Sequence, residues 1–180
     1  MNVDELSSVL TESQRLGFLG ARPIDEVIEH ASGFVTALVD VTGTVVDLGS
    51  GGGVPGLVIA CARPDLEMVL VDRRSKRTDF LMRMVRRHRI SDRVQVISAD
   101  TAELVSRRGA TFDAAVARGF GPPRSTLEVG LSLVRPGGLV VISEPPEGDR
   151  WSTDVVRAAG ATRRDDQTGV AVFERRPDPR

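Results

Sequence analysis

Short runs of apolar residues recur along the middle of the chain, and each is followed by a turn and a helical pattern. The runs are rich in β-branched side chains, as in strands that are covered on both faces. They fall at residues 45–48, 68–71, 94–97, 112–117 and 139–142. Between and after them, apolar residues repeat with helical spacing at residues 55–60, 75–89, 101 onward and 124–133. This alternation predicts an α/β fold with a doubly wound, mostly parallel sheet.

Both ends of the chain add elements to this pattern. The N-terminal helical patterns cover residues 3–15 and 24–39, the C-terminal one covers 151–159, and two strand patterns cover 161–165 and 170–174. We expect the N-terminal helices, which are separated by a break at 17–23, to pack over a ligand crevice or the sheet edge. The two late strands flank a turn at 167–169 and predict an antiparallel C-terminal hairpin, which makes a sheet of seven strands.

The length of the chain fits one domain. A domain of 180 residues buries about 70% of the surface of its unfolded chain, so neither a disulfide nor a metal is needed to hold it together. We expect this domain over residues 1–175, as a monomer without a metal site, followed by a disordered tail at 176–180. Its expected parts are a helical cap at 1–40, a cofactor-binding core at 44–143, and the C-terminal helix and hairpin at 151–175.

Cysteine usage and hydropathy bear on location. Cys61, the one cysteine, lies in the apolar part of a predicted helix, where a small buried hydrophobe is expected rather than a nucleophile. No apolar run approaches the roughly 18 residues that span a bilayer. The start from Met1 to Glu5 is unlike a basic signal peptide. We therefore expect a cytoplasmic protein with no membrane segment.

The net charge of −1 favours no class of partner, but the charges are unevenly distributed. Residues 1–47 carry eight acids and two arginines, whereas residues 73–93 carry nine bases and two acids. The second segment fits a patch that faces phosphate groups. A GC-rich genome is an alternative source of this bias, because 23 of the 24 basic residues are arginines.

A glycine-rich stretch from Val45 to Gly56 combines a buried strand, a turn and the start of a helix. Glycines remove the Cβ atoms where the chain turns and let a ligand approach the backbone. Pro55 suits the first helical position, and the N-terminus of this helix would present free N–H groups to an anionic group. The spacing Gly51-x-Gly53-x-x-Gly56 also fits the dinucleotide fingerprint, so the loop by itself leaves the ligand open.

Two acids beside this loop narrow the class of ligand. Asp47 lies inside the end of the first strand, and Asp72 closes the second, about 20 residues beyond the turn. A doubly wound sheet places a carboxylate that binds ribose hydroxyls at this second position. The pair suits a nucleoside ligand without a phosphate, such as S-adenosylmethionine. Its carboxylate would meet the helix N-terminus, its ribose would meet Asp72, and its positive charge would face Asp47.

Further residues match a known family. The segment from Asp47 to Gly56 is followed by Arg63-Pro64, Asp72, Lys76-Arg77, Phe80-Leu81 and Ala117-Arg118-Gly119-Phe120. This combination resembles the RsmG (GidB) family over residues 44–143. The family comprises Rossmann-like class I methyltransferases that use S-adenosylmethionine to methylate guanine N7 in small-subunit (16S) ribosomal RNA. The resemblance implies this fold, cofactor, reaction and RNA partner.

The resemblance also implies candidate site residues. Arg118 and Phe120 follow the fourth strand, where they would orient the acceptor base and stack on it. Thr101 and Ala102 match a pair that contacts adenine, and Asp100 is a further acceptor there or a helix N-cap, two roles that can coexist. The expected cofactor contacts are Asp47, Gly49, Ser50, Gly51, Gly53, Val54, Asp72, Arg73, Asp100, Thr101, Ala102 and Arg118. The expected RNA contacts are Arg73, Arg74, Lys76 and Arg77.

Methyl transfer to guanine N7 needs alignment more than a general base, because the attacking lone pair lies in the ring plane and carries no proton. This agrees with the lack of an evident catalytic His, Cys or Lys. His30 occupies the place of a family histidine whose neighbours are changed here, and a packed or surface role is commoner for a lone helical histidine.

One segment departs from the family and keeps alternatives open. Residues 143–147 read Ser-Glu-Pro-Pro-Glu where the family often has a Lys-Gly pair, which places two acids on the expected RNA side. A small-molecule methyltransferase with the same cofactor half is one alternative, and a cofactor-binding protein without turnover is another. A dinucleotide oxidoreductase ranks last, because it rests on fold analogy without a catalytic acid or base in place.

Overall fold

The strands form one mixed sheet in the order β3-β2-β1-β4-β5-β7-β6. The computed structural model describes residues 1–145, 150–164 and 169–177. The strands are β1 (Thr44–Leu48), β2 (Glu67–Asp72), β3 (Val94–Ser98), β4 (Phe112–Ala117), β5 (Val134–Ser143), β6 (Ala161–Arg163) and β7 (Val170–Arg175). β1 to β5 are parallel, and β7 pairs antiparallel with both β5 and β6. The predicted doubly wound, mostly parallel sheet with an antiparallel C-terminal hairpin is confirmed.

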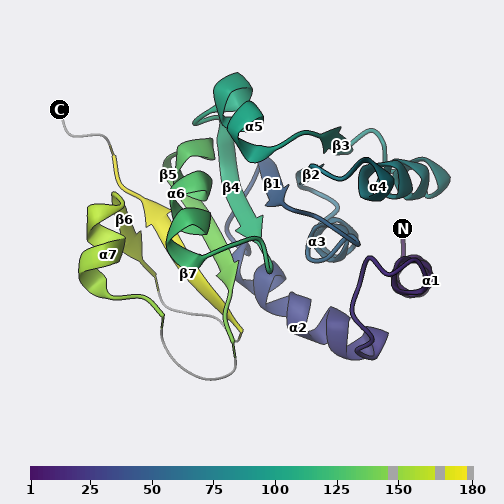
Figure 1. Cartoon of the computed structure of the whole chain (residues 1–180). Helices are drawn as coiled ribbons and strands as arrows, with labels where there is room; N and C mark the ends of the chain where they lie inside the picture. Colours follow the sequence, from purple (N-terminus) through teal and green to yellow (C-terminus); the bar gives the residue numbers. More distant parts are fainter. Residues whose placement is uncertain (146–149, 165–168, 178–180) are drawn as a thin grey trace.

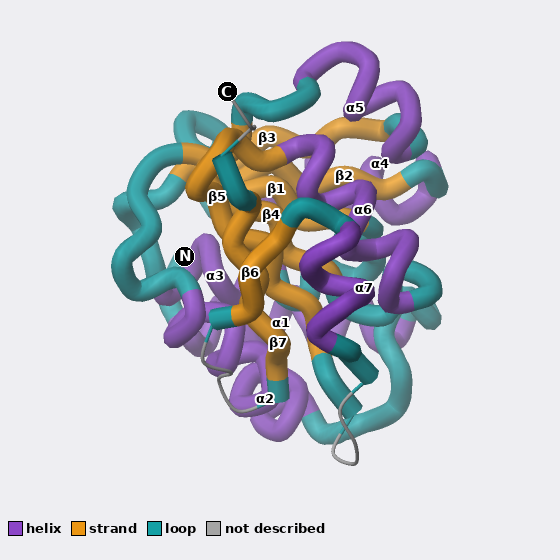
Figure 2. Tube along the Cα trace, turned by 90° about the vertical axis from the view of Figure 1, so that its left-hand side faces the viewer, coloured by secondary structure: helices purple, strands orange, loops and turns teal. Residues whose placement is uncertain are grey.

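Helices cover both faces of this sheet. They are α1 (Val3–Arg15), α2 (Ile24–Ala37), α3 (Gly56–Ala62), α4 (Ser75–Arg87), α5 (Thr101–Arg108), α6 (Pro123–Leu133) and α7 (Thr153–Ala158). Figure 1 shows the strands in the middle of the molecule with helices around them. After a quarter-turn, Figure 2 shows α6 and α7 on one side of the strands and α2 and α3 on the other.

Two hydrophobic cores result from the two-residue period of the strands. In β1, Val45 packs in the core under α1 to α4, whereas Val46 and Leu48 pack in the core under α5 to α7. Successive side chains of a strand point to opposite faces, so a strand covered on both sides is apolar at nearly every position. The same alternation turns Asp47 toward α3, where its carboxylate meets the Gly56 amide.

Some element boundaries differ from the predicted ones. α3 begins at Gly56, and Pro55, which follows a cis peptide bond, is its N-cap. β5 begins at Val134 rather than at residue 139, because Val134 pairs with Phe112 before a register irregularity. Parts of four predicted features lie outside the described residues: 146 and 147 of the departing segment, 165 of the strand pattern at 161–165, 167 and 168 of the hairpin turn, and 178–180 of the tail.

Candidate functional site

The carboxyl ends of the parallel strands gather the predicted site residues at one edge of the sheet. The chain moves outward from β1 to β2 and β3 in one direction, and from β4 to β5 in the other. The strand order therefore reverses between β1 and β4, and ligands of open α/β sheets bind in the crevice at such a point. The glycine loop follows β1, Asp72 ends β2, and Arg118 follows β4.

The glycine loop is held from within, which differs from the expected free helix N-terminus. The Gly56 amide donates to Asp47 Oδ2 at 3.1 Å, and the Leu57 amide donates to the Gly53 carbonyl at 2.8 Å. Val54, Pro55 and Gly56 are buried. The N-terminal end of α3 thus already faces a carboxylate from β1, and a ligand carboxylate has to find other partners.

Asp47 is a fully buried carboxyl group with one unused acceptor. Its exposed fraction is 0%, and its Oδ1 atom has no hydrogen-bond partner among the described residues. Burial raises the pKa of Asp47 to about 7, because an ionised carboxylate loses its hydration there. A Cβ atom at Gly56 would lie 2.5 Å from Asp47 Oδ2, so the close approach of loop and carboxylate requires glycine. Negative charge at Asp47 would be favoured by a nearby cation.

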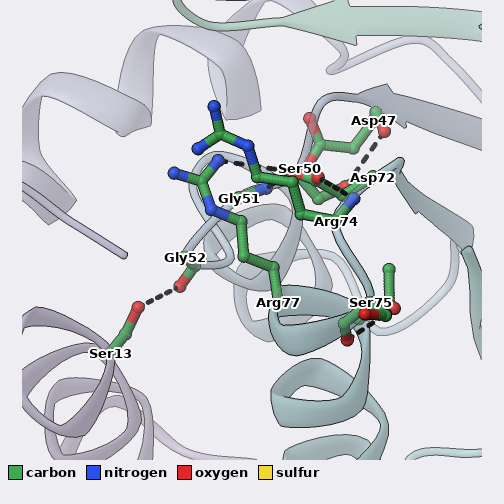
Figure 3. A network of polar contacts seen from close by, with 10 residues as sticks. Ser13, Asp47, Ser50, Gly51, Gly52, Asp72, Arg74, Ser75 and Arg77 are labelled. Carbon is green, nitrogen blue, oxygen red and sulfur yellow. Dashed lines mark hydrogen bonds and ion pairs between the residues drawn. The ribbon is translucent and has the colours of Figure 1, made fainter. Parts of the chain in front are cut away.

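Asp72 fastens the glycine loop to the end of β2. Its Oδ2 accepts a hydrogen bond from the Gly51 amide and its Oδ1 accepts one from the Arg74 amide, both at 2.9 Å. Arg77 Nη1 lies 3.5 Å from Asp72 Oδ2, and the Ser50 amide donates to the Val71 carbonyl at 2.9 Å. Figure 3 shows Gly51, Arg74 and Arg77 around this carboxylate.

A cavity of about 360 Å³, here called the β2–β3 cavity, opens beside Asp72. It is lined by Gly49, Val71, Asp72, Arg73, Arg74, Arg77, Ala99, Asp100, Thr101, Gly119 and Phe120. Five of the expected cofactor contacts are therefore brought together, namely Gly49, Asp72, Arg73, Asp100 and Thr101. Asp100 is also the predicted N-cap of α5, since its Oδ1 accepts from the Glu103 amide at 2.9 Å.

The other expected cofactor contacts lie outside this cavity lining. Asp47, Ser50, Gly51, Gly53 and Val54 are buried in or beneath the loop. Ala102 is exposed on the first turn of α5, one residue beyond Thr101 of the lining. Arg118 lines a second cavity. Val71, Ala99 and Gly119 also line the β2–β3 cavity but were not among the predicted site residues. Their position at, or within two residues of, the ends of predicted strands could have indicated them.

The second cavity, here called the β4–β5 cleft, measures about 640 Å³ and lies beside the ends of β4 and β5. Arg118 and Phe120 line it together with His30 of α2 and with Arg22. Burial, followed by the charge of Arg22, lowers the pKa of Arg118, whereas Asp47 acts in the opposite direction. Burial and the charges of Arg118 and Arg22 lower the pKa of His30, which favours its neutral form.

Phe120 separates the two cavities. It lines both, as does Gly119. A Cβ atom at Gly49 would lie 2.9 Å from Phe120 Cδ2, and Gly49 has a φ of 69°. The ring therefore packs directly on the backbone at the start of the glycine loop, which both the contact and the backbone conformation restrict to glycine.

The acid at position 144 is neutralised within the cleft wall. Glu144 Oε1 accepts hydrogen bonds from Arg150 Nη2 and Trp151 Nε1, both at 2.8 Å. The side chain of Glu144 is 13% exposed. This ion pair and hydrogen bond offset the negative charge of Glu144, one of the two acids of the departing segment, whereas Glu147 lies outside the described residues.

The basic residues after β2 fall into two groups. Arg73, Arg74 and Lys76 are exposed, as expected for side chains that meet phosphate groups. Arg77 instead lies over the loop, where Nη1 is 3.4 Å from the position of a Gly51 Cβ atom. Arg77 therefore has a structural role in the cavity wall that competes with its predicted role as an RNA contact.

The N-terminal helices reach the glycine loop directly. Ser13 Oγ of α1 donates to the Gly52 carbonyl at 2.9 Å, and both residues are buried. A Cβ atom at Gly52 would lie 2.4 Å from Ser13 Oγ and 2.5 Å from Leu19 Cγ. The contact between Ser13 and Gly52 is visible in Figure 3. The predicted helical cap thus touches the loop itself.

Other chemistries find little support in the part of the chain that the structure covers. Within residues 1–145, 150–164 and 169–177, no helix has the length and apolar character needed to cross a membrane. In the same ranges, no group of three or more His, Cys, Asp or Glu side chains is arranged to bind a metal ion. Burial raises the pKa of the Cys61 thiol, which disfavours the nucleophilic thiolate.

Known sequences resemble the chain over most of its length. The family model described as rRNA small subunit methyltransferase G (GidB) matches residues 6–146. The ribosomal RNA small subunit methyltransferase G of Salinispora arenicola is 38% identical over 148 residues, which are 77% of this chain and 61% of that protein. Its namesake from Acidothermus cellulolyticus is 35% identical over 129 residues, covering 69% and 55%. The chain therefore spans less than two thirds of the length of these relatives.

Solved structures share the fold at low sequence identity. A 1,6-didemethyltoxoflavin-N1-methyltransferase from Burkholderia thailandensis, solved with S-adenosylhomocysteine, has a TM-score of 0.63 at 18% identity, covering 98% of this chain and 92% of that one. The [4+2]-cyclase SpnF has a TM-score of 0.61 at 21% identity, covering 89% and 70%. Because a cyclase and a methyltransferase are both similar to this chain, these structures establish its fold but not the reaction that it catalyses.

Proposed function

The chain belongs to the rRNA small subunit methyltransferase G (GidB) family, and on this premise we propose that it transfers a methyl group from S-adenosylmethionine to guanine N7 of small-subunit ribosomal RNA. One observation carries the proposal. The matched residues, 6–146, include all of the lining of the β2–β3 cavity and, apart from Arg150, all of the described lining of the β4–β5 cleft. The match therefore covers the candidate site as well as the fold.

The residues at the ends of β1 and β2 fit S-adenosylmethionine. We assign Asp72, which faces the β2–β3 cavity, to the ribose hydroxyls, and Asp100 and Thr101 to the adenine. Asp47 lies buried beneath the loop with one unpaired oxygen, and its carboxylate would attract the positive charge of a cationic ligand. When bound, the cofactor supplies an electrophilic methyl group on a sulfonium. A protein of the same fold holds its demethylated product, S-adenosylhomocysteine.

Arg118 and Phe120 are the residues that we assign to the acceptor. Both line the β4–β5 cleft, and Phe120 also borders the β2–β3 cavity, so an acceptor that contacts the ring lies beside the cofactor site. Flat side chains of this kind hold splayed RNA bases by stacking. Guanine N7 brings its own lone pair, so the task of these residues is alignment, which accounts for about 7–11 kcal/mol in well-oriented reactions.

The charge of the cleft favours an anionic acceptor. Arg22 and Arg118 line it, whereas Glu144 is already paired with Arg150. Exposed basic side chains at the start of α4 add further positive charge beside the β2–β3 cavity. This distribution supports RNA over an uncharged small molecule as the methyl acceptor.

Labelled cofactor provides the direct test of this proposal. The chain is incubated with tritium-labelled S-adenosylmethionine and small ribosomal subunits that lack N7-methylguanine, and the labelled base is identified after digestion of the RNA. We expect label at guanine N7. Label found in a small metabolite and not in RNA would reject the ribosomal assignment, and cofactor binding without any transfer would reject an enzyme.

The ribose assignment is tested with Asp72→Asn. This change keeps the shape of the side chain and removes its charge, so we expect the affinity for S-adenosylhomocysteine, measured by calorimetry, to fall by about 1–3 kcal/mol. Asp79→Asn, at an exposed position of α4, is the matched control and should bind normally. Unfolding curves are recorded in parallel, because Asp72 also accepts from two loop amides. Unchanged affinity would place the ribose elsewhere.

A further inference from the structure

Two arginine side chains share the β4–β5 cleft, and neither has an ion pair with an acid among the described residues. Arg118 follows β4 and is half-buried, whereas Arg22 is exposed in the linker between α1 and α2. Neither guanidinium makes a hydrogen bond or an ion pair in the portion of the chain that is described. Among the nearby acids, Glu144 is paired with Arg150, and Asp47, whose charge acts on Arg118, is buried behind the loop. Glu26 and Glu29 line a separate cavity with Arg22 but form no ion pair with it among the described residues.

The two charges are close enough to oppose each other. The charge of Arg22 contributes to lowering the pKa of Arg118, and both arginines contribute to lowering that of His30. A partly buried cation without an ion pair is unfavourable, because it has lost hydration, and the charge of Asp47 offsets this only in part, since the pKa of Arg118 is lowered overall. An anion between the two guanidinium groups would remove the repulsion and use their fixed, planar arrays of N–H donors.

The location of the pair indicates which anion this is. The cleft is about 640 Å³, which exceeds the needs of a single small ion, and it meets the β2–β3 cavity at Phe120. A base lying toward Phe120 would leave its sugar and phosphate in the rest of the cleft, which the two arginines line. Phosphate oxygens are well suited to paired guanidinium groups.

We propose that Arg22 and Arg118 form a phosphate subsite, so that the chain recognises its acceptor as a nucleotide and not as a free base or nucleoside. This inference rests on the proposed function and adds the chemical class of the group in the cleft. It also gives the N-terminal region a part in acceptor binding, because Arg22 precedes α2 while Arg118 follows β4.

Calorimetry with guanosine 5′-monophosphate, guanosine and inorganic phosphate tests the subsite. The protein is first saturated with S-adenosylhomocysteine, and every titration is repeated without it. We expect the monophosphate to bind about tenfold more tightly than guanosine, the difference that charge-assisted hydrogen bonds to one phosphate provide. In Arg22→Gln the two should bind within about twofold of each other, because one guanidinium is lost.

Arg107→Gln is the matched control. Arg107 is exposed on α5 and paired with Glu103, remote in sequence from the cleft, so this variant should keep the tenfold discrimination. Equal affinity of wild type for the nucleotide and the nucleoside, no heat with the monophosphate, or discrimination retained in Arg22→Gln would each overturn the subsite. Failure of S-adenosylhomocysteine to bind would instead reject the proposed function, and the titrations without it still decide the subsite.

Discussion

Asp47 is the residue whose environment most constrains its chemistry. It belongs to the strand that the glycine loop follows, and its position in the two-residue period directs it under that loop. The Gly56 amide satisfies one of its oxygens and nothing described satisfies the other. Because its pKa is about 7 in the fold and 3.8 in a free side chain, the folded protein holds a proton that the unfolded chain releases.

The sign of the resulting pH effect follows from that difference. Below about pH 4 both states are protonated and the contribution is fully present, and it is lost as the pH rises toward 7. We expect the free energy of unfolding of wild type to fall over this range by up to about 1.4 kcal/mol per pH unit from this group. Asp47→Asn should remove this slope, as measured by urea unfolding between pH 4.5 and 8.5. Asp92→Asn, at an exposed position, should not. Parallel curves for wild type and Asp47→Asn would contradict the burial argument.

The sequence indicated many site residues but missed Arg22. Asp72, Asp100 and Arg118 were predictable, because each lies at a strand end and parallel strands bring these ends to one edge. Arg22 lies in a break between two helices, with no periodicity to place its side chain. Its entry into the cleft depends on how the N-terminal helices pack, which no local pattern specifies.

At the scale of elements, α1 and the glycine loop form one structural unit. The hydroxyl of Ser13 donates to the carbonyl of Gly52, and Leu19 fills the space that a side chain at Gly52 would need. A helix near the start of the chain thus supports a loop that follows the first strand. The N-terminal helices were expected to pack over the crevice, and the contact between Ser13 and Gly52 shows where α1 meets the glycine loop.

Ser13→Ala tests this support. The change leaves a buried carbonyl without its donor, and we expect the free energy of unfolding to fall by about 1–3 kcal/mol. A looser loop should also weaken binding of S-adenosylhomocysteine in calorimetry. Ser8→Ala, at an exposed position of the same helix, is the control and should change stability by no more than about 0.5 kcal/mol. Equal behaviour of the two variants would mean that the contact contributes nothing to the loop.

The elements themselves were largely predictable, and the exceptions have local causes. The strand runs are easily recognised because β1, β2 and β4, in the middle of the parallel part of the sheet, are buried at nearly every position. The helix after the loop was expected to leave its first amides free. They are not free because Asp47 and Gly53 supply acceptors, a tertiary arrangement that the spacing of glycines does not show.

At the scale of the whole molecule, basic residues continue from the cleft to α4. Arg73 and Arg74 line the β2–β3 cavity and are exposed, as is Lys76. Arg83, Arg86 and Arg87 lie farther along the same helix, away from its cavity end. In a doubly wound sheet the start of such a helix lies beside the crevice, so the first group should carry the RNA contacts.

The salt dependence of RNA binding distinguishes these groups. Each phosphate contact adds about 0.7–0.9 to the slope of log K against log salt, because counterions are released. The triple variant Arg73→Gln, Arg74→Gln, Lys76→Gln should therefore lower the slope by about 2 with a small-subunit rRNA transcript. The control triple Arg83→Gln, Arg86→Gln, Arg87→Gln should change it by less than about 1. The opposite ranking would move the RNA face to the far part of α4.

The aromatic wall at Phe120 has a consequence for inhibitor design. A compound built to fill the β2–β3 cavity and another built to fill the β4–β5 cleft would both contact the Phe120 ring, which packs on Gly49. A bisubstrate inhibitor would therefore need a linker that passes this ring or displaces it. The free energy needed to displace the ring would reduce the affinity gained by joining the two halves.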